Sequence, residues 1–123
     1  MNPVDSSGWL EYFADGPLAT KYASYLEKSD DLLMPSLVLY EVYRWLKRHK
    51  GEEEALKYAA KMSEAKVIEL DDSLALYAAD VSLEHHLAFA DSVVYATALS
   101  HHASLITSDS DFKGLPHVTY FPK

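Results

Sequence analysis

Apolar residues recur at spacings of three and four along most of the chain, a pattern that predicts amphipathic helices. The segments that carry it are 7–14, 18–28, 36–49, 52–65, 72–86 and 90–102. Short runs rich in Val, Ile, Leu or Tyr lie between them and are typical of strands; they are 3–5, 32–34, 67–70, 104–107 and 118–121. Because short apolar strands separated by helices require crossover connections, the pattern predicts an α/β fold of three layers (α/β/α), with helices on both faces of a short parallel sheet.

The length of 123 residues suits a single domain spanning 1–123, since no linker, repeat or shift in composition divides the chain. Cysteine is absent, which excludes a disulfide framework and thiolate metal ligands and favours a reducing compartment. The first residues lack the basic and apolar regions of a secretory signal. The uncharged stretch 92–107 is shorter than the ~20 apolar residues that span a bilayer. We therefore expect a cytoplasmic protein without a membrane segment.

The charge balance is less ordinary, because 19 acidic residues outnumber 11 basic ones and leave a net charge of -8. Phosphate contacts with Lys and Arg supply most of the non-specific affinity of proteins for nucleic acids. At first sight the balance therefore argues against a polyanionic partner. It directs attention to where the acidic residues lie.

Three acidic residues directly follow predicted strands. Asp5 ends the first strand, and Asp109 and Asp111 follow the fourth. Ligands and chemistry gather at the carboxyl ends of parallel strands, so these carboxylates are candidates for one shared site. Each also has a simpler interpretation, since Asp5 could cap the helix after it and Asp109 could cap a single turn.

Two further acidic residues interrupt apolar helical segments. Glu41 lies at the edge of the buried stripe of 36–49, beside Arg44 and Arg48 on a helical wheel. A carboxylate there is costly unless it is bound to a cation or paired, and a surface ion pair with either arginine is the alternative. Asp91 opens a segment that is apolar on every side, which predicts a buried helix whose leading carboxylate enters the interior or a cleft. A helix cap and a metal ligand are both compatible with that position.

Together these positions indicate a cation site. In a parallel sheet, Asp5 and Asp109 lie at strand ends, and Glu41 and Asp91 lie near helix starts that face the same rim. Like charges crowded together without a cation would raise each other's pKa and destabilise the fold. Oxygen ligands, with no cysteine and no histidine at ligand spacing, select Mg²⁺ or Mn²⁺ over Zn²⁺. The adjacent histidines at 85–86 and 101–102 point about 100° apart on a helix and are not expected to share an ion.

These segments resemble a known family. In order and spacing, the chain is similar to the PIN domain, specifically to VapC-type toxins of toxin–antitoxin pairs, from residue 4 to residue 118; the resemblance is carried by Val4-Asp5-Ser6-Ser7, the helix around Glu41, 87–99 and 105–112. It implies a metal-dependent endoribonuclease, often a homodimer, that is held inactive by a small antitoxin protein whose C-terminal tail lies across the active site. It further implies catalytic roles for Asp5, Glu41, Asp91 and Asp109, metal ligation by Asp5, Asp91, Asp109 and Asp111, and supporting hydroxyls at Ser6 and Thr107.

The reaction that this resemblance implies is hydrolysis of an RNA phosphodiester by a metal-activated water, with one or two Mg²⁺ (or Mn²⁺) ions as cofactor. Two features depart from the family pattern. Pro3 removes a donor from the first strand, so we expect that strand to begin late or to lie so that the N–H of this position is not needed. The chain after Phe112 is short, so the sequence does not indicate how the last strand pairs.

Basic residues near the end of segment 36–49 are the candidates for contact with RNA. Arg44, Lys47 and Arg48 follow Glu41 within seven residues, and we expect Arg44 and Arg48 to reach phosphates from the Glu41 edge. Their simpler role is to complement the negative end of the helix dipole.

Two other functions are alternatives. A receiver-like phospho-acceptor domain has a similar length and sheet, but it requires an acidic pair after the first strand, where Asp5 is followed by Ser6. It also requires a lysine after the last strand, where only Lys123 follows. A catalytically inactive binding module with the PIN fold would act without a metal.

Overall fold

The computed structural model describes residues 1–123, apart from the side chain of Ser29. Its α-helices are α1 Ser6–Phe13, α2 Ala19–Leu26, α3 Ser36–Lys50, α4 Glu52–Met62, α5 Asp72–His85 and α6 Phe89–Ser100. Its strands are β1 Asn2–Pro3, β2 Leu32–Pro35, β3 Lys66–Ile68, β4 Leu105–Thr107 and β5 Val118–Tyr120, and two single 3₁₀ turns are η1 Ser29–Asp31 and η2 Ser110–Phe112. The predicted helices agree with these bounds to within three residues at every end.

All strands in the described chain are parallel and lie in two pieces of sheet. One piece has the order β1-β2-β3 and the other pairs β4 with β5. The pieces meet at a bridge between Val4 and Ile106, where the Asp5 N–H donates to the Ile106 carbonyl at 2.9 Å. The spatial order is therefore β3-β2-β1-β4-β5, and the chain reverses direction across the sheet between β1 and β4. In open parallel sheets this reversal is where ligand sites form.

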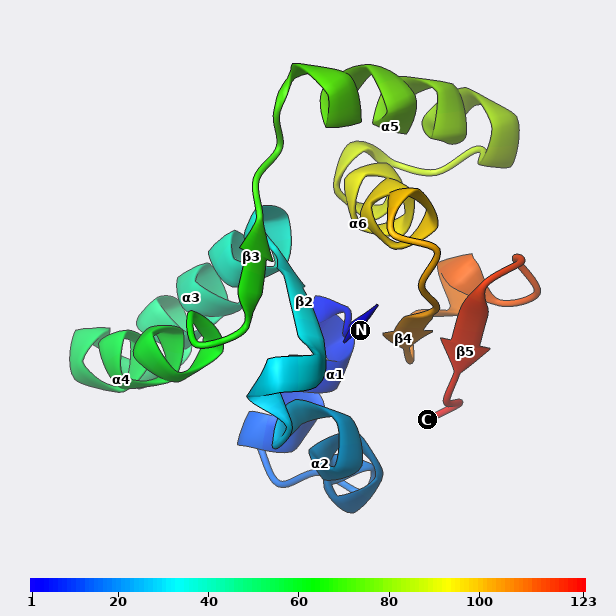
Figure 1. Ribbon diagram of the computed structural model, residues 1–123. Coiled ribbons are helices and arrows are strands. Elements are labelled where there is room, and N and C mark those ends of the chain that lie inside the picture. Colours follow the sequence, from blue (N-terminus) through cyan, green and yellow to red (C-terminus); the bar gives the residue numbers. More distant parts are fainter.

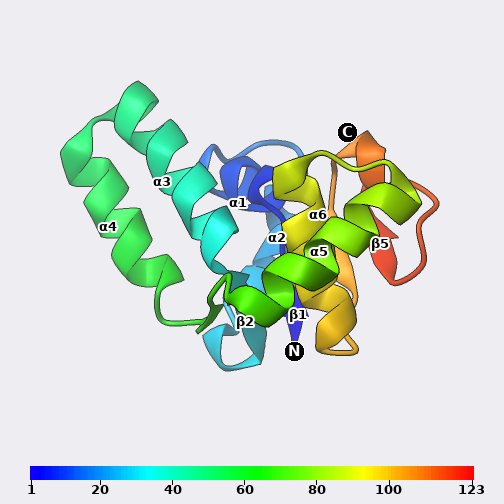
Figure 2. The same cartoon turned by 90° about the horizontal axis from the view of Figure 1, so that it is seen from above.

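Helices cover both faces of the sheet, as predicted from the alternation of elements. In Figure 1, α5 and α6 lie above the strands, α1 and α2 lie below them, and the α3–α4 hairpin lies on the β3 side. Seen from above in Figure 2, α5 crosses over α6 and the α3–α4 hairpin projects away from the sheet. No helix of the described chain combines the length and the apolar character needed to cross a bilayer.

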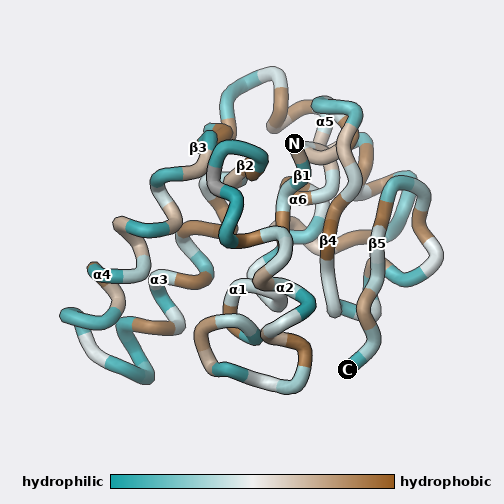
Figure 3. The backbone as a smooth tube through the Cα atoms, turned by 60° about the horizontal axis from the view of Figure 1, so that its bottom comes forward, coloured by the Kyte–Doolittle hydropathy of each residue, from teal (hydrophilic) through white to brown (hydrophobic). Residues whose placement is uncertain are grey.

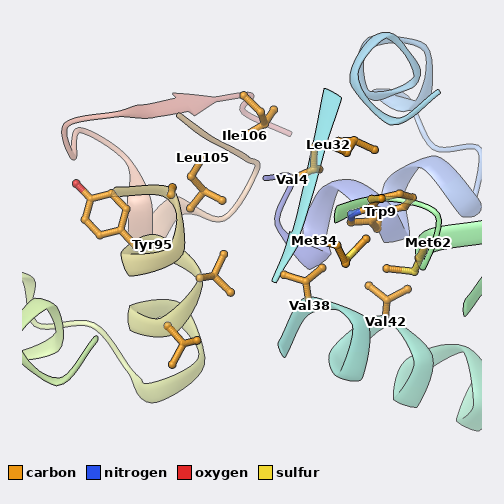
Figure 4. Close-up of a cluster of buried hydrophobic side chains, with 14 of the residues drawn as sticks. Val4, Trp9, Leu32, Met34, Val38, Val42, Met62, Tyr95, Leu105 and Ile106 are labelled. Atoms are coloured by element: carbon orange, nitrogen blue, oxygen red, sulfur yellow. The ribbon is translucent and has the colours of Figure 1, made fainter. Parts of the chain in front are cut away.

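The hydrophobic core follows the strands and the inner faces of the helices. Figure 4 shows one part of it between β2, α1 and α3 and another around α6 and β4; its labelled members are Val4, Trp9, Leu32, Met34, Val38, Val42, Met62, Tyr95, Leu105 and Ile106. In Figure 3 the hydrophobic colour is continuous through β4, whereas polar and apolar positions alternate along α4. Helix α6 is buried from Ser92 to Ala98, which confirms the expectation from its all-round apolar sequence.

Two strand predictions are wrong. The third strand is Lys66–Ile68 rather than 67–70, because its partner β2 ends at Pro35, which pairs with Ile68, and α3 begins at the next residue. The first strand begins early, at Asn2, rather than late. The Asp5 N–H faces β4 and donates to the Ile106 carbonyl. Backbone nitrogens two residues apart on a strand face the same side, so the nitrogen of Pro3 also faces the β4 side. At the level of Pro3, however, β4 has not yet begun, because its first residue is Leu105. The missing donor of Pro3 therefore interrupts no ladder.

Candidate active site

Asp5 occupies the carboxyl end of β1, at the point where the sheet reverses its order. Its side chain is 3% exposed, and burial raises its pKa above the ordinary value. Hydrogen bonds from the Thr107 hydroxyl, the Ser6 backbone and the Ser7 hydroxyl oppose this rise, and the nearby Asp109 charge adds to it. The carboxylate does not cap α1 in the usual way, since no side-chain cap bond is present at this N-terminus. Asp5 thus occupies the N-cap position of α1, as the cap interpretation expects, but its carboxylate makes no cap hydrogen bond there.

Two hydroxyls hold one oxygen of Asp5. Thr107 Oγ1 donates to Asp5 Oδ2 at 3.0 Å, and Ser7 Oγ donates to the same oxygen at 3.3 Å. Thr107 Oγ1 also accepts the N–H of Asp109 at 2.9 Å. Because Thr107 ends β4 and Asp5 follows β1, this hydroxyl fixes the loop that carries Asp109 against the end of the neighbouring strand.

Glu41 reaches the site from α3 and is half-buried. Burial raises its pKa above the ordinary value, the charge of Asp5 and the more distant charge of Asp109 raise it further, and a hydrogen bond with Ser6 lowers it. No ion pair joins Glu41 to Arg44 or Arg48 anywhere in the described chain. The surface ion-pair alternative is therefore wrong, and the predicted supporting hydroxyl of Ser6 contacts Glu41.

Asp91 lies in the first turn of α6 rather than at its cap, since the helix begins two residues earlier, at Phe89. Burial raises the pKa of this carboxyl to about 7, and the charges of Asp109, Asp5, Asp111 and Glu41 contribute in that order. A carboxyl with a pKa so far above its usual value lies in a site crowded with negative charge. Such groups concentrate at functional sites.

Asp109 and Asp111 complete the cluster from the turn after β4. Asp109 caps η2, its Oδ1 accepting the N–H of Asp111 at 2.9 Å, so the turn interpretation of this segment is correct. One carboxylate oxygen each from Asp91, Asp109 and Asp111 lie within 4.8 Å of one another. The cap and the cluster thus coexist, because Asp109 has a second oxygen.

Of the predicted ligands, Asp91, Asp109 and Asp111 form this close triangle, whereas Asp5 is outside it and interacts with it through its charge. No ion pair in the described part of the chain involves any of these carboxylates. A set of carboxylate oxygens without a basic partner fits a hard divalent cation, which neutralises the crowded charge.

The predicted RNA-contacting residues lie on the exposed outer side of α3. Arg44, Lys47 and Arg48 line a shallow groove of about 460 Å³ together with Tyr40 and Tyr43. Lys47 forms an exposed ion pair with Glu52 at 3.4 Å, whereas neither arginine forms an ion pair in the described chain. The basic residues thus share α3 with Glu41 but take no part in the acidic cluster.

Sequence reasoning missed three residues that organise the site. Ser7, Ser108 and Tyr22 link α1, α2 and the turn after β4 by hydrogen bonds near Asp5. The Ser7 position was part of the recognised motif, but serine near a helix start is too common to identify a role. Nothing in the sequence connects Tyr22 to Ser108, which lies 86 residues further along the chain.

Comparison with known proteins supports the same region. The sequence model described as the PIN domain matches residues 4–118. None of the curated proteins matches the chain in a sequence comparison.

Solved structures share the whole fold at low identity. A toxin–antitoxin complex from Klebsiella pneumoniae aligns with a TM-score of 0.84 at 20% identity and covers 100% of both chains. Mycobacterium tuberculosis VapC20, described as a sarcin–ricin loop cleaving toxin, aligns with a TM-score of 0.76 at 20% identity over 99% of this chain and 100% of its own. DNA-bound VapBC from Salmonella typhimurium aligns with a TM-score of 0.75 at 13% identity over 98% and 96% of the two chains.

Proposed function

This chain belongs to the PIN domain family, and from that membership we propose that it is a metal-dependent endoribonuclease. The observation that carries the proposal is the group of five acidic residues at the reversal point of the sheet, three of them within 4.8 Å of one another and none of them in an ion pair of the described chain; they are Asp5, Glu41, Asp91, Asp109 and Asp111. A carboxylate cluster that bound no cation would destabilise the fold through charge repulsion and would serve no purpose.

The acidic residues have different proposed roles, which follow from where each one lies in the site. Asp91, Asp109 and Asp111 would hold a divalent cation, with Asp5 beside them and its Oδ2 already held by two hydroxyls. When bound, Mg²⁺ or Mn²⁺ at such a site lowers the pKa of a water and stabilises negative charge on a phosphate. Glu41 faces the cluster from α3, where it would orient the attacking water. Hydrolysis of this kind requires no protein nucleophile.

We further propose that the protein is the toxin of a toxin–antitoxin pair. Two of the similar structures are described as toxin–antitoxin or VapBC complexes, and one as a sarcin–ricin loop cleaving toxin, which supports an antitoxin partner and an RNA target. A cationic side chain of the antitoxin would fit the acidic cluster. An enzyme that acts on cellular RNA would work in the cytoplasm, and we propose contact with RNA through Arg44, Lys47 and Arg48.

RNA cleavage by the purified chain tests this function. We expect cleavage in Mg²⁺ or Mn²⁺, loss of cleavage in EDTA, and loss of about 100-fold or more in Asp5→Asn and Asp91→Asn, because each removes a carboxylate charge that would help to hold the cation. Asp80→Asn is the matched control, since Asp80 is an exposed acidic residue on α5.

The outcomes separate the alternatives. Undiminished cleavage in EDTA or in both variants would contradict the assignment. Metal-independent RNA binding without cleavage would indicate an inactive binding module, and stable labelling by a small phosphodonor would indicate a phospho-acceptor domain.

A further inference from the structure

Tyr22 carries a buried hydroxyl that reaches the site from α2. Its side chain is 0% exposed, and its hydroxyl oxygen lies 2.5 Å from Ser108 Oγ, in the turn between β4 and Asp109. This short hydrogen bond joins a helix on the lower face of the sheet to the turn after β4, which bears Asp109 and Asp111. A buried tyrosine hydroxyl needs such a partner. Here the partner lies outside α2, in the turn after β4.

Ser108 also connects Tyr22 to Asp5, through the hydroxyl of Ser7. The Ser108 N–H donates to Ser7 Oγ at 3.1 Å, and Ser7 Oγ donates to Asp5 Oδ2 at 3.3 Å. The Ser7 and Thr107 hydroxyls are themselves 3.4 Å apart. A continuous set of hydrogen bonds therefore runs from Tyr22 to Asp5, and Thr107 extends it to the Asp109 N–H.

Gly8 provides the space that Tyr22 occupies. A Cβ atom at position 8 would lie 2.6 Å from Val4 Cγ1 and 2.7 Å from Tyr22 Cδ1, both too close for atoms in contact. The ring of Tyr22 thus packs directly against the backbone of α1, beside the strand that ends at Asp5. Only glycine permits this close approach of the Tyr22 ring to α1. The contact with Gly8 and the hydrogen bond to Ser108 therefore both hold Tyr22 in position.

We propose that Tyr22 is a positioning residue for the cation site, a role that rests on the proposed function. Through Ser108 and Ser7 it fixes the distance between the two segments that supply Asp5 and Asp109. These segments come from the two pieces of the sheet, which the backbone joins at the Val4–Ile106 bridge. The hydroxyl network adds side-chain contacts across the same junction.

Mn²⁺ binding to Tyr22→Phe, measured by calorimetry, tests the proposal without any RNA. We expect affinity about 10-fold weaker than that of the wild type, the size of effect seen when a group behind a metal ligand is removed. Tyr95→Phe is the matched control. Tyr95 is also 0% exposed and donates a 2.6 Å hydrogen bond, to the Pro116 carbonyl, so its loss should leave Mn²⁺ affinity within about twofold.

Ser108→Ala provides a second route to the same contact. It should weaken Mn²⁺ binding to a similar extent, and combining it with Tyr22→Phe should add little further loss, because both remove one interaction. Thermal unfolding of each variant separates a lost fold from a lost ligand geometry.

Wild-type affinity in Tyr22→Phe, an equal loss in Tyr95→Phe, or a wild-type protein that binds no Mn²⁺ would each overturn the positioning role. A wild-type protein that binds Mn²⁺ but cleaves no RNA would instead contradict the proposed function and leave this role intact.

Discussion

The raised pKa of Asp91 shows the free-energy cost of placing several carboxylates close together in one partly buried site. It is half-buried in the first turn of α6, and burial together with four neighbouring carboxylates raises its pKa to about 7. Its ordinary value of 3.8 applies in the unfolded chain. Between these two values the folded protein holds a proton that the unfolded chain has released, so stability falls as the pH rises through this range and the contribution is lost above about pH 7.

We therefore expect metal-free Asp91→Asn to be more stable than the wild type at pH 8 and equal to it near pH 4. The difference should reach about 1 to 2 kcal/mol, after allowance for solvent screening at a half-exposed group, or about 4 to 8 °C in Tm. Thermal unfolding in EDTA at both pH values measures it.

Asp80→Asn is the control for that experiment, because Asp80 is exposed on α5. A wild type that gains stability relative to Asp91→Asn as the pH rises would show that the crowded cluster imposes no cost. Adding Mg²⁺ at pH 8 should stabilise the wild type and leave Asp91→Asn less affected.

Residue types decided how much of the site could be predicted. Asp5 and Asp109 stand at strand ends, and Glu41 interrupts an apolar helix face, so a carboxylate in each place is informative by itself. Ser7 and Tyr22 carry no such signal, because serine is common near helix starts and tyrosine is common in cores. Their roles depend on a contact made across the fold, which no local pattern encodes.

At the scale of elements, α3 separates two surfaces. Its inner face buries Val38, Val42 and Leu46, its edge presents Glu41 to the acidic cluster, and its outer face bears Tyr40 and the basic residues of the groove. Trp45, on the same helix, is only partly buried against the core and stacks on His49 with 4.3 Å between ring centroids.

We expect Arg44→Ala combined with Arg48→Ala to weaken RNA binding and to reduce its dependence on salt. Loss of two phosphate contacts should lower the slope of log K against log salt by about 1.4 for a single strand. Fluorescence anisotropy with an inactive Asp91→Asn background measures the slope without cleavage.

The matched control replaces Lys57 on α4 and Lys66 on β3, two exposed lysines outside α3 and its groove, by alanine. An unchanged slope in the arginine variant, or an equal change in the lysine control, would show that α3 does not contact the phosphates.

Elements were predicted best where one pattern determines them. The helices follow from apolar spacing alone, whereas the end of a strand depends on how far its partner extends. Leu70 belongs to the apolar pattern of the predicted strand, yet β2 stops at Pro35, so no backbone remains for residues 69 and 70 to pair with. Leu70 is 37% exposed as a result. Partner length is a property of the fold and not of the segment.

At the scale of the whole molecule, the acidity of the chain belongs mainly to its site. The cluster holds five of the 19 acidic residues, which leaves 14 acidic against 11 basic residues and a net charge of -3 elsewhere. A net charge of -8 therefore does not exclude RNA as a partner. It implies that without a cation the protein should repel RNA from its own cluster.

Helix α5 presents large apolar side chains to solvent. Leu76 is 73% and Leu83 79% exposed, one heptad apart on one face, and Phe89 beyond the helix is 65% exposed. Exposed apolar patches of this kind mark interaction surfaces. The inner residues of α5 are Leu74, Ala78 and Val81, so the outer face is free of the core. Because the family resemblance implies a homodimer, we propose this face as the surface that a second copy of the chain would cover.

Light scattering coupled to size exclusion should find the wild type as a homodimer and Leu76→Ser with Leu83→Ser as a monomer that keeps its thermal stability. Leu56→Ser is the control, because Leu56 on α4 is also an exposed leucine, at 55%. A monomeric wild type, or a double variant that stays dimeric, would contradict this assignment of the surface.

The bridge at Val4 and Ile106 has a consequence for the cohesion of the molecule. It is the backbone junction between the two pieces of sheet in the described chain, and the acidic residues sit on both sides of it. Mutual repulsion of their charges pushes the two pieces apart, and the cation proposed for Asp91, Asp109 and Asp111 would weaken that repulsion by neutralising the β4 side of the junction. We therefore expect the metal-bound protein to hold its two pieces of sheet together more firmly than the metal-free protein does.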